Sequence, residues 1–311
     1  YPLQIENGAC RIALHEDGSA LIQIGATDLG QGSDTVFAQM ASEILTIPES
    51  KITVASMQDT DITPYDAGAY ASRESYVSGG AVKKTALLLK DKILKSAAAM
   101  LKRNAQELAL ADERIVDADG RALCTIGDAA TYTLFVNDQK TETEQLCAEA
   151  TYTCFHNTFA FGASFADVEV DVPLGRVKVK KICSVHDSGT ILNPQLAKGQ
   201  VCGGIAMGMG YALCEQLLYD EKGRMRNNNF LDYKIPTSMD MPEMLVDFVQ
   251  TYEPSGPFGN KALGEPPQIP QAPAIRNALL HATGVSIYKL PMSPQNLVHA
   301  FIGAGLIREE E

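Results

Sequence analysis

The chain has 311 residues, of which 45% are hydrophobic and 21% are charged, so it can bury the core of one large domain or two ordinary ones. Its formal net charge of −12 argues against a nucleic-acid partner and against electrostatic docking on an anionic membrane. The sequence has no run of about 18 apolar residues and no signal-peptide pattern at its start. We therefore expect a cytoplasmic protein with neither nucleic acid nor membrane as a partner.

The seven cysteines are scattered without any C-x-x-C pair, and we interpret them as reduced thiols. Zinc and iron–sulfur sites use closely spaced cysteines, so any such cluster is expected on another chain. His156 and His186 have no partners at metal-ligand spacing and are interpreted as core or surface histidines. Because the first residue is Tyr1 rather than Met, we expect the chain to be one piece of something longer.

The first third of the chain predicts a hairpin followed by two helices. Apolar runs at 11–15 and 20–24 flank an Asp-Gly turn, which is a strong hairpin signal. A glycine-rich link, residues 25–32, leads to Ser33, which we predict as the N-cap of a helix. A longer helix is predicted over 80–103 from its apolar stripe.

The rest of the chain predicts a second hairpin and two more helices. Residues 104–158 are weakly patterned. Alternating acidic residues at 167–172 can face basic residues at 176–180 across a hairpin. A helix of small residues follows at about 194–217, and a final helical pattern spans 272–283.

Hairpins and helices thus come in blocks rather than as βαβ units, which favours an α+β fold. The order hairpin, glycine-rich link, helix begins near residue 9 and again near residue 166. This repetition is compatible with two similar α+β halves, which we place at 1–160 and 161–311.

Four segments are rich in glycine and small polar residues, namely 30–35, 68–73, 199–208 and 261–267. Glycine lets the backbone approach a ligand, and the amides at a helix start favour an anion such as phosphate. Each segment also has an ordinary explanation: a turn and cap, close helix packing, or, for Glu265, a solvated loop carboxylate. The residues by themselves indicate an α+β protein with a cleft for an anionic cofactor.

Taken together and in order, the segments resemble the molybdenum hydroxylases of the xanthine dehydrogenase and aldehyde oxidase family. The residues of these segments are most similar to those of bacterial xanthine dehydrogenase molybdenum subunits, and segments 60–66 and 231–234 are supporting matches. The stretches that carry the resemblance are TDLGQGSDT at 27–35, GAYASR at 68–73, VHDSG at 185–189 with GQVCGG at 199–204, and KALGEPP at 261–267.

The resemblance implies a fold, a cofactor and a set of site residues. It implies the elongated molybdenum-cofactor-binding domain of this family, with the metal held by the pterin dithiolene and by no protein ligand. The catalytic base would be Glu265. The implied cofactor-binding residues are Gly30, Gln31, Gly32, Ser33, Ala69, Tyr70, Ala71, Ser72, Arg73, Gln200, Gly204, Met207, Lys261 and Gly264.

Within this set the resemblance also suggests individual roles. Gln31 and Gln200 would bind polar edges of the pterin, Ser72 would contact its phosphate, and Ala71 would leave room beside the metal. Many relatives carry a glutamine where this chain has Met207, so one cofactor hydrogen bond would be absent or supplied by another group.

The implied activity is hydroxylation of an electron-poor carbon in an aromatic N-heterocycle, with oxygen derived from water. A purine such as xanthine or hypoxanthine is the leading substrate. The cofactor would be molybdopterin in its cytosine dinucleotide form, and electrons would leave through iron–sulfur and FAD partner chains. The family's upstream half is absent from the sequence, so the N-terminal half of the molybdopterin subunit is a further expected partner.

Two alternatives remain open within this family. The chain could be the medium molybdopterin subunit of a nicotinate dehydrogenase-type enzyme, or a cofactor-binding scaffold that is inactive without its partner. A purely structural, glycine-rich protein is a third class, which four ordered motifs argue against.

Overall fold

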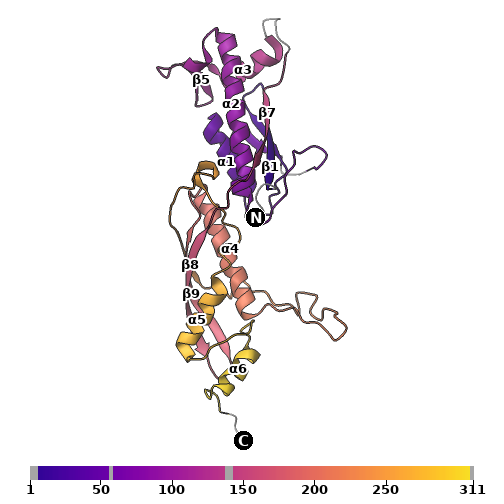
Figure 1. The fold of residues 1–311 in the computed structure, drawn as a ribbon, viewed down its shortest axis with the longest axis vertical. Helices are drawn as coiled ribbons and strands as arrows, with labels where there is room; N and C mark the ends of the chain where they lie inside the picture. Colours follow the sequence, from indigo (N-terminus) through magenta and orange to yellow (C-terminus); the bar gives the residue numbers. More distant parts are fainter. Residues whose placement is uncertain (1–5, 56–58, 137–142, 309–311) are drawn as a thin grey trace. The chain divides into compact units, whose positions relative to one another are not determined.

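The computed structural model describes residues 6–55, 59–136 and 143–308, and its contacts divide the chain into two compact units (Figure 1). Unit 1 comprises Tyr1–Thr158 and Tyr252–Ala262, and unit 2 comprises Phe159–Thr251 and Leu263–Glu311. The predicted second half, 161–311, therefore contributes the stretch Tyr252–Ala262 to unit 1. Tyr1 and residues 137–142 lie outside the described residues. None of the helices within the described ranges combines the length and the apolar character that crossing a bilayer requires.

Unit 1 is built on a four-stranded sheet with the order β3-β2-β1-β7. β1 pairs antiparallel with β2 and with β7, while β3 runs parallel to β2. The predicted first hairpin is confirmed, with Gly18 at φ +82° in its turn. The four strands are β1 (Asn7–Leu14), β2 (Ala20–Ile24), β3 (Ile52–Val54) and β7 (Cys147–Thr153).

Two helices, α1 (Ser33–Leu45) and α2 (Gly79–Leu101), pack together, and α2 also covers β1 and β7. The predicted stripe of α2 is confirmed, because its apolar residues are fully buried at helical spacing: Val82, Ala86, Leu89, Ile93 and Ala97. The predicted N-cap of α1 is wrong. The cap is Gly32, at φ +86°, and the Ser33 hydroxyl instead accepts a hydrogen bond from the Gln31 amide at 3.0 Å.

The weakly patterned region 104–158 contains more regular structure than its sequence indicates. It holds a small antiparallel sheet, a short helix with a capping box between Thr125 and Asp128, and strand β7. The new strands have three or four residues each, too few to show a periodic pattern. The elements are η3 (Ala105–Glu107), β4 (Ala109–Ala111), β5 (Arg114–Val116), β6 (Ala122–Thr125), α3 (Ile126–Thr131) and η4 (Tyr132–Val136).

Unit 2 contains a three-stranded sheet with the order β10-β9-β8. β8 (Phe161–Asp171) and β9 (Arg176–Asp187) form the predicted second hairpin, in which Glu169 faces Lys178 and Asp171 faces Arg176. β10 (Glu243–Phe248) adds in parallel to β9. The helices are α4 (Pro194–Leu213), α5 (Gln271–Thr283) and α6 (Pro294–Gly303).

The core of unit 2 forms between the inner face of the sheet and these helices. Its fully buried members come from β9, α4, α5 and α6, among them Ile182, Val201, Ile205, Ile275 and Phe301. Helix α4 ends at Leu213, four residues before the predicted end. Each unit also contains one crossover that the sequence did not predict, in which a helix connects two parallel strands: β2-α1-β3 in unit 1 and β9-α4-β10 in unit 2. Both sheets keep an antiparallel hairpin, and the predicted α+β class is confirmed.

Candidate cofactor-binding loops and the Glu265 segment

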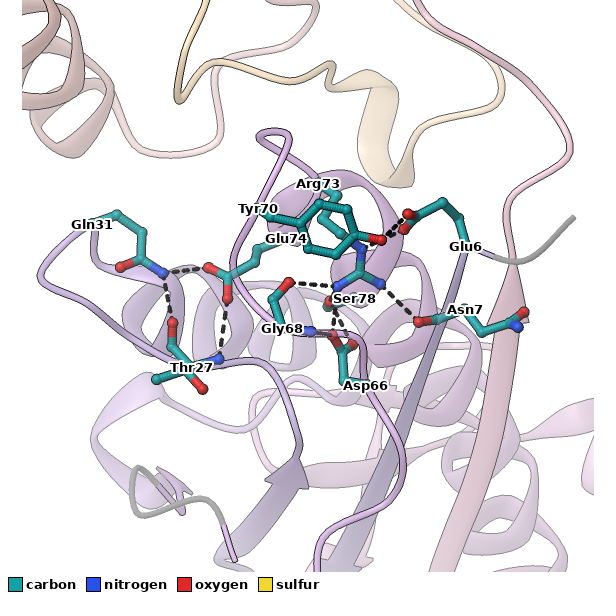
Figure 2. Close-up of polar contacts among 10 residues, drawn as sticks. All are labelled: Glu6, Asn7, Thr27, Gln31, Asp66, Gly68, Tyr70, Arg73, Glu74 and Ser78. Atoms are coloured by element: carbon teal, nitrogen blue, oxygen red, sulfur yellow. Dashed lines mark hydrogen bonds and ion pairs between the residues drawn. The ribbon is translucent and has the colours of Figure 1, made fainter. Parts of the chain in front are cut away.

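A buried arginine anchors the loop 68–72 of unit 1 (Figure 2). The guanidinium of Arg73 is fully buried and bonds to the carboxylates of Glu6, at 2.6 Å, and of Asp66. It also donates to the carbonyls of Gly68 at 2.9 Å and of Asn7 at 2.7 Å. One cation therefore ties both ends of the loop to the start of β1, and each of its partners is polar or charged, as a buried charge requires.

The backbone of this loop is strained. Ala71 and Ser72 both have positive φ values, +48° and +56°, which cost about 1–3 kcal/mol each in residues other than glycine. Tyr70 reinforces the same cluster, because its hydroxyl donates to Glu6 and its ring lies 5.6 Å from the guanidinium of Arg73. The hydrogen bond to Glu6 raises the pKa of Tyr70 to about 12. Strain of this kind concentrates at ligand-binding sites.

The glycine-rich link 25–32 is organised by its own carboxylate. Asp28 accepts hydrogen bonds from the backbone N–H groups of Gly30, Gly32 and Asp34 at 2.7, 3.4 and 3.2 Å. These amides lie at the N-terminus of α1, where a negative charge is favourable. Part of the anion-binding capacity that the sequence predicts here is therefore used by Asp28.

Glu74 joins the two loops (Figure 2). It is only 7% exposed, and it begins η2 (Glu74–Ser78), one turn of π-helix directly after Arg73. Its carboxylate accepts from the backbone N–H of Thr27 at 3.1 Å and from the side-chain amide of Gln31. Burial raises the pKa of Glu74 to about 7.

Gln31 uses both ends of its amide within unit 1. Its nitrogen also donates to the carbonyl of Thr27 at 3.0 Å, and its oxygen accepts from the N–H of Leu29 at 2.5 Å. Gly30 is exposed at φ +102°, and a side chain there would meet nothing within 4 Å. The structure thus brings Gln31 and Ser33 into one set of hydrogen bonds with Glu74, while Arg73, the residue before Glu74, is at the centre of a second set with Glu6 and Asp66.

The predicted residues of α4 lie at different depths in unit 2. Gly204 is buried, and a Cβ there would lie 2.7 Å from Cβ of Pro267. Met207 is 57% exposed and Gln200 is half-buried. The helix begins with Asn193 as a true N-cap, whose side chain accepts from the N–H of Leu196 at 3.0 Å.

Glu265 lies in a turn that leads into α5. Both Glu265 and Gly264 are exposed, and the carbonyl of Glu265 accepts from the N–H of Gln268 at 3.0 Å. Pro266 and Pro267 follow it directly and fix φ at two consecutive positions. Lys261, at the start of the same motif, is half-buried and belongs to unit 1.

Three acidic residues that support the loops were missed from the sequence: Glu6, Asp66 and Glu74. Asp66 ends the segment 60–66, already noted as a match, and Glu74 directly follows a predicted site residue. Glu6 carries no such signal, because it lies 67 positions from the arginine that it binds.

Over the described ranges, no group of three or more His, Cys, Asp or Glu side chains could hold a metal ion, and all seven cysteines are free thiols.

Comparison with known proteins identifies the family. Residues 2–242 match the model of the molybdopterin cofactor-binding domain. The xanthine dehydrogenase molybdenum-binding subunit of Escherichia coli O157:H7 is 46% identical over 310 residues, which cover 99% of this chain and 41% of that subunit. The chain thus spans about two fifths of the length of this relative.

Solved structures agree with this match. Carbon monoxide dehydrogenase from Oligotropha carboxidovorans superimposes with a TM-score of 0.88 at 27% identity, over 96% of this chain and 37% of that one. Quinoline 2-oxidoreductase from Pseudomonas putida 86 superimposes with a TM-score of 0.86 at 26% identity, over 94% of this chain and 38% of that one. The chain therefore belongs to the molybdopterin cofactor-binding domains of the xanthine dehydrogenase-type molybdenum hydroxylases.

Proposed function

We propose that this chain forms the cofactor-binding and base-supplying part of a molybdenum hydroxylase that oxidises an aromatic N-heterocycle, with xanthine or hypoxanthine as the leading substrate. The observation that carries the proposal is the 46% identity over 310 residues to a xanthine dehydrogenase molybdenum-binding subunit. That match includes the motif 261–267, which lies beyond the region covered by the family model.

The loop 68–72 fits a phosphate-bearing pterin. It offers a serine hydroxyl, small side chains, and Gly68 at φ +98° with open space where a Cβ would be. The single positive charge of Arg73 offsets one of the two negative charges of the nearby carboxylates of Glu6 and Asp66, which lowers the repulsion that an approaching anion would meet. Because Arg73 is fully buried, we assign it to holding the loop, while Ser72 and the backbone contact the phosphate.

When bound, the molybdenum cofactor supplies the two-electron redox chemistry. Glu265 is the proposed base, whose carboxylate takes the proton that water-derived oxygen must lose. Its exposure leaves the carboxylate accessible, and the two following prolines limit the movement of its backbone. Gln31 and Gln200 are proposed to bind the polar edges of the pterin, with Gln31 exchanging one of its present hydrogen bonds for one to the cofactor.

The remaining parts of the machinery are proposed to lie on partner chains. Electrons must leave toward iron–sulfur clusters and FAD, and the N-terminal half of the molybdopterin subunit would complete the cofactor site. The cytosine dinucleotide form of the cofactor is part of the same proposal.

The test is to purify the protein anaerobically from its native host, measure molybdenum per chain, and identify the co-purifying polypeptides. We expect near-stoichiometric molybdenum, release of CMP on acid hydrolysis, and flavin and iron–sulfur partners. Turnover of purines by the complex but not by the chain alone would identify the partners that activity requires. A complex with no molybdenum would contradict the proposal.

A further inference from the structure

A buried polar cluster lies directly behind the Glu265 segment in unit 2. It comprises Ser184 and His186 on β9, Ser164 on β8, and Gln271 at the first position of α5. Gln271 and Ser184 are fully buried and His186 is 1% exposed. Polar side chains are unusual in such a position, so the cluster calls for an explanation.

Gln271 connects this cluster to the backbone beside Glu265. Its amide nitrogen lies 2.7 Å from the carbonyl oxygen of Pro267, two residues after the proposed base. A carbonyl oxygen only accepts hydrogen bonds, so this contact fixes which end of the amide faces Pro267. The same nitrogen also reaches the hydroxyl of Ser164 at 3.0 Å.

The cluster continues from there into the sheet. The hydroxyls of Ser164 and Ser184 lie 2.7 Å apart, and Ser184 Oγ lies 2.8 Å from His186 Nε2. Burial lowers the pKa of His186, so its imidazole is neutral near pH 7. An unbroken series of hydrogen bonds therefore runs from the turn after Glu265 to two strands of the sheet.

Two glycines of α4 form the other wall of this arrangement. A Cβ at Gly204 would lie 2.7 Å from Cβ of Pro267, and a Cβ at Gly208 would lie 2.5 Å from Cβ of Gln271. Glycines four residues apart lie on one face of a helix, so at these two positions the face of α4 that packs against the turn carries no side chain. The turn is held by hydrogen bonds on one side and by close packing on the other.

The cluster is not the arrangement that would maximise stability. Gln271 Oε1 and His186 Nδ1 are buried and have no hydrogen-bond partner among the described residues. A buried group without a partner costs about 1–3 kcal/mol, which an apolar side chain of similar size would avoid. The polar side chain of Gln271 therefore serves a purpose other than raising the free energy of unfolding.

We propose that Gln271 is a positioning residue for Glu265, an inference that rests on the proposed function. The N–H of Gln268 bonds to the carbonyl of Glu265 at 3.0 Å, and the two prolines have fixed φ. Holding the Pro267 carbonyl therefore holds the whole turn, and with it the direction in which the Glu265 carboxylate leaves the backbone. His186 and the two serines act through Gln271 by fixing its amide.

The decisive variant is Gln271→Met, which keeps the length of the side chain and removes the amide. In the purified complex we expect kcat to fall about tenfold to hundredfold, as misplacement of a reacting group does, with KM within about twofold of wild type. Molybdenum content should not change. Amide hydrogen exchange in a peptide spanning 263–270 should become faster, a readout that does not depend on the loaded cofactor.

Two further variants separate positioning from a structural role. Thr283→Val, at the far end of α5, removes another side-chain hydrogen bond, of 2.8 Å to the carbonyl of Leu279, and should leave kcat and exchange in 263–270 unchanged. Gln271→Glu can donate to Pro267 only while its carboxyl is protonated. The ratio of its kcat to that of wild type should therefore rise as the pH falls, and this remains measurable if Gln271→Met does not fold.

Wild-type kcat and exchange in Gln271→Met, alongside an inactive Glu265→Gln complex, would overturn the positioning role and leave the proposed function standing. Wild-type turnover in Glu265→Gln would overturn the proposed function itself, and the positioning inference with it.

Discussion

The side-chain amide of Gln31 donates a hydrogen bond to the carboxylate of Glu74, 43 positions later in the chain. This contact joins the glycine-rich link 25–32 to the helical turn that follows the strained loop 68–72. Because burial raises the pKa of Glu74 to about 7, the strength of the contact depends on pH in the physiological range.

Glu74 should make the stability of the protein fall as the pH rises from about 4.5 to about 7. The pKa of Glu74 is higher in the folded protein than the ordinary value of 4.5, so the folded state binds more protons in this interval and ionisation works against it. Relative to wild type, Glu74→Gln should gain about 1–3 kcal/mol of unfolding free energy across the interval, at 1.36 kcal/mol per pKa unit.

Urea unfolding of both proteins at a series of pH values measures this difference. Glu43→Gln, on the exposed face of α1, controls for the loss of one negative charge. A difference between Glu74→Gln and wild type that does not change with pH would show that the carboxylate of Glu74 is not perturbed as described.

Arg73→Met should be among the most destabilising substitutions in unit 1. It leaves the buried carboxylates of Glu6 and Asp66 without their counter-ion, a loss of about 3–5 kcal/mol in unfolding free energy. Arg103→Met serves as the control, because Arg103 is 45% exposed and lies 3.9 Å from Asp117, and its loss should cost less than about 1 kcal/mol. Equal midpoints for the two variants in urea would contradict the role assigned to Arg73.

Replacing the strained residues with glycine should stabilise the fold and weaken cofactor retention. Ala71→Gly and Ser72→Gly remove the cost of a positive φ. Because glycine also increases the entropy of the unfolded chain, we expect a net gain of at most about 1 kcal/mol in unfolding free energy. The same change should let the loop leave its binding conformation. Lys102→Gly, at φ +51° at the end of α2, is a matched control that should gain stability with unchanged molybdenum content. Unchanged molybdenum retention in both loop variants would contradict a phosphate-binding role for the loop.

Two adjacent glycines of α4 should respond in opposite ways to alanine. A Cβ at Gly204 would lie 2.7 Å from Cβ of Pro267, so Gly204→Ala should cost about 1–3 kcal/mol and shift the turn that carries Glu265. At Gly203 a Cβ meets nothing within 4 Å, so Gly203→Ala should gain about 0.5–1 kcal/mol from helix propensity. Thermal unfolding and hydrogen exchange over 263–270 measure both effects. A stabilising Gly204→Ala would contradict the observed packing.

The sequence was sufficient to predict the elements whose patterns repeat. The alternation along β8 and β9 and the apolar stripe of α2 lie in the sequence itself, because burial repeats with the period of the backbone. The short strands β4, β5 and β6 have no length over which a period can appear. The cap of α1 was misassigned because Asp28, rather than Ser33, takes the N–H groups at the helix start.

The residues of the candidate site likewise fall into those that local sequence patterns reveal and those that only the folded structure reveals. Its glycine-rich loops were found from local motifs that resemble a known family. The residues that support those loops were not, because Glu6 and Arg73 meet only through the pairing of distant segments. Gln271 was likewise invisible in sequence, since nothing local shows that its amide faces Pro267 rather than solvent.

The most direct measurement is the turnover of Glu265→Gln in the purified complex, with molybdenum content determined on the same sample. We expect kcat to fall by at least about a hundredfold, the usual cost of losing a general base, with molybdenum per chain near that of wild type. Glu221→Gln, another exposed carboxylate of unit 2, should retain full turnover. Substantial turnover in Glu265→Gln at normal molybdenum content would contradict the assignment of Glu265 as the base.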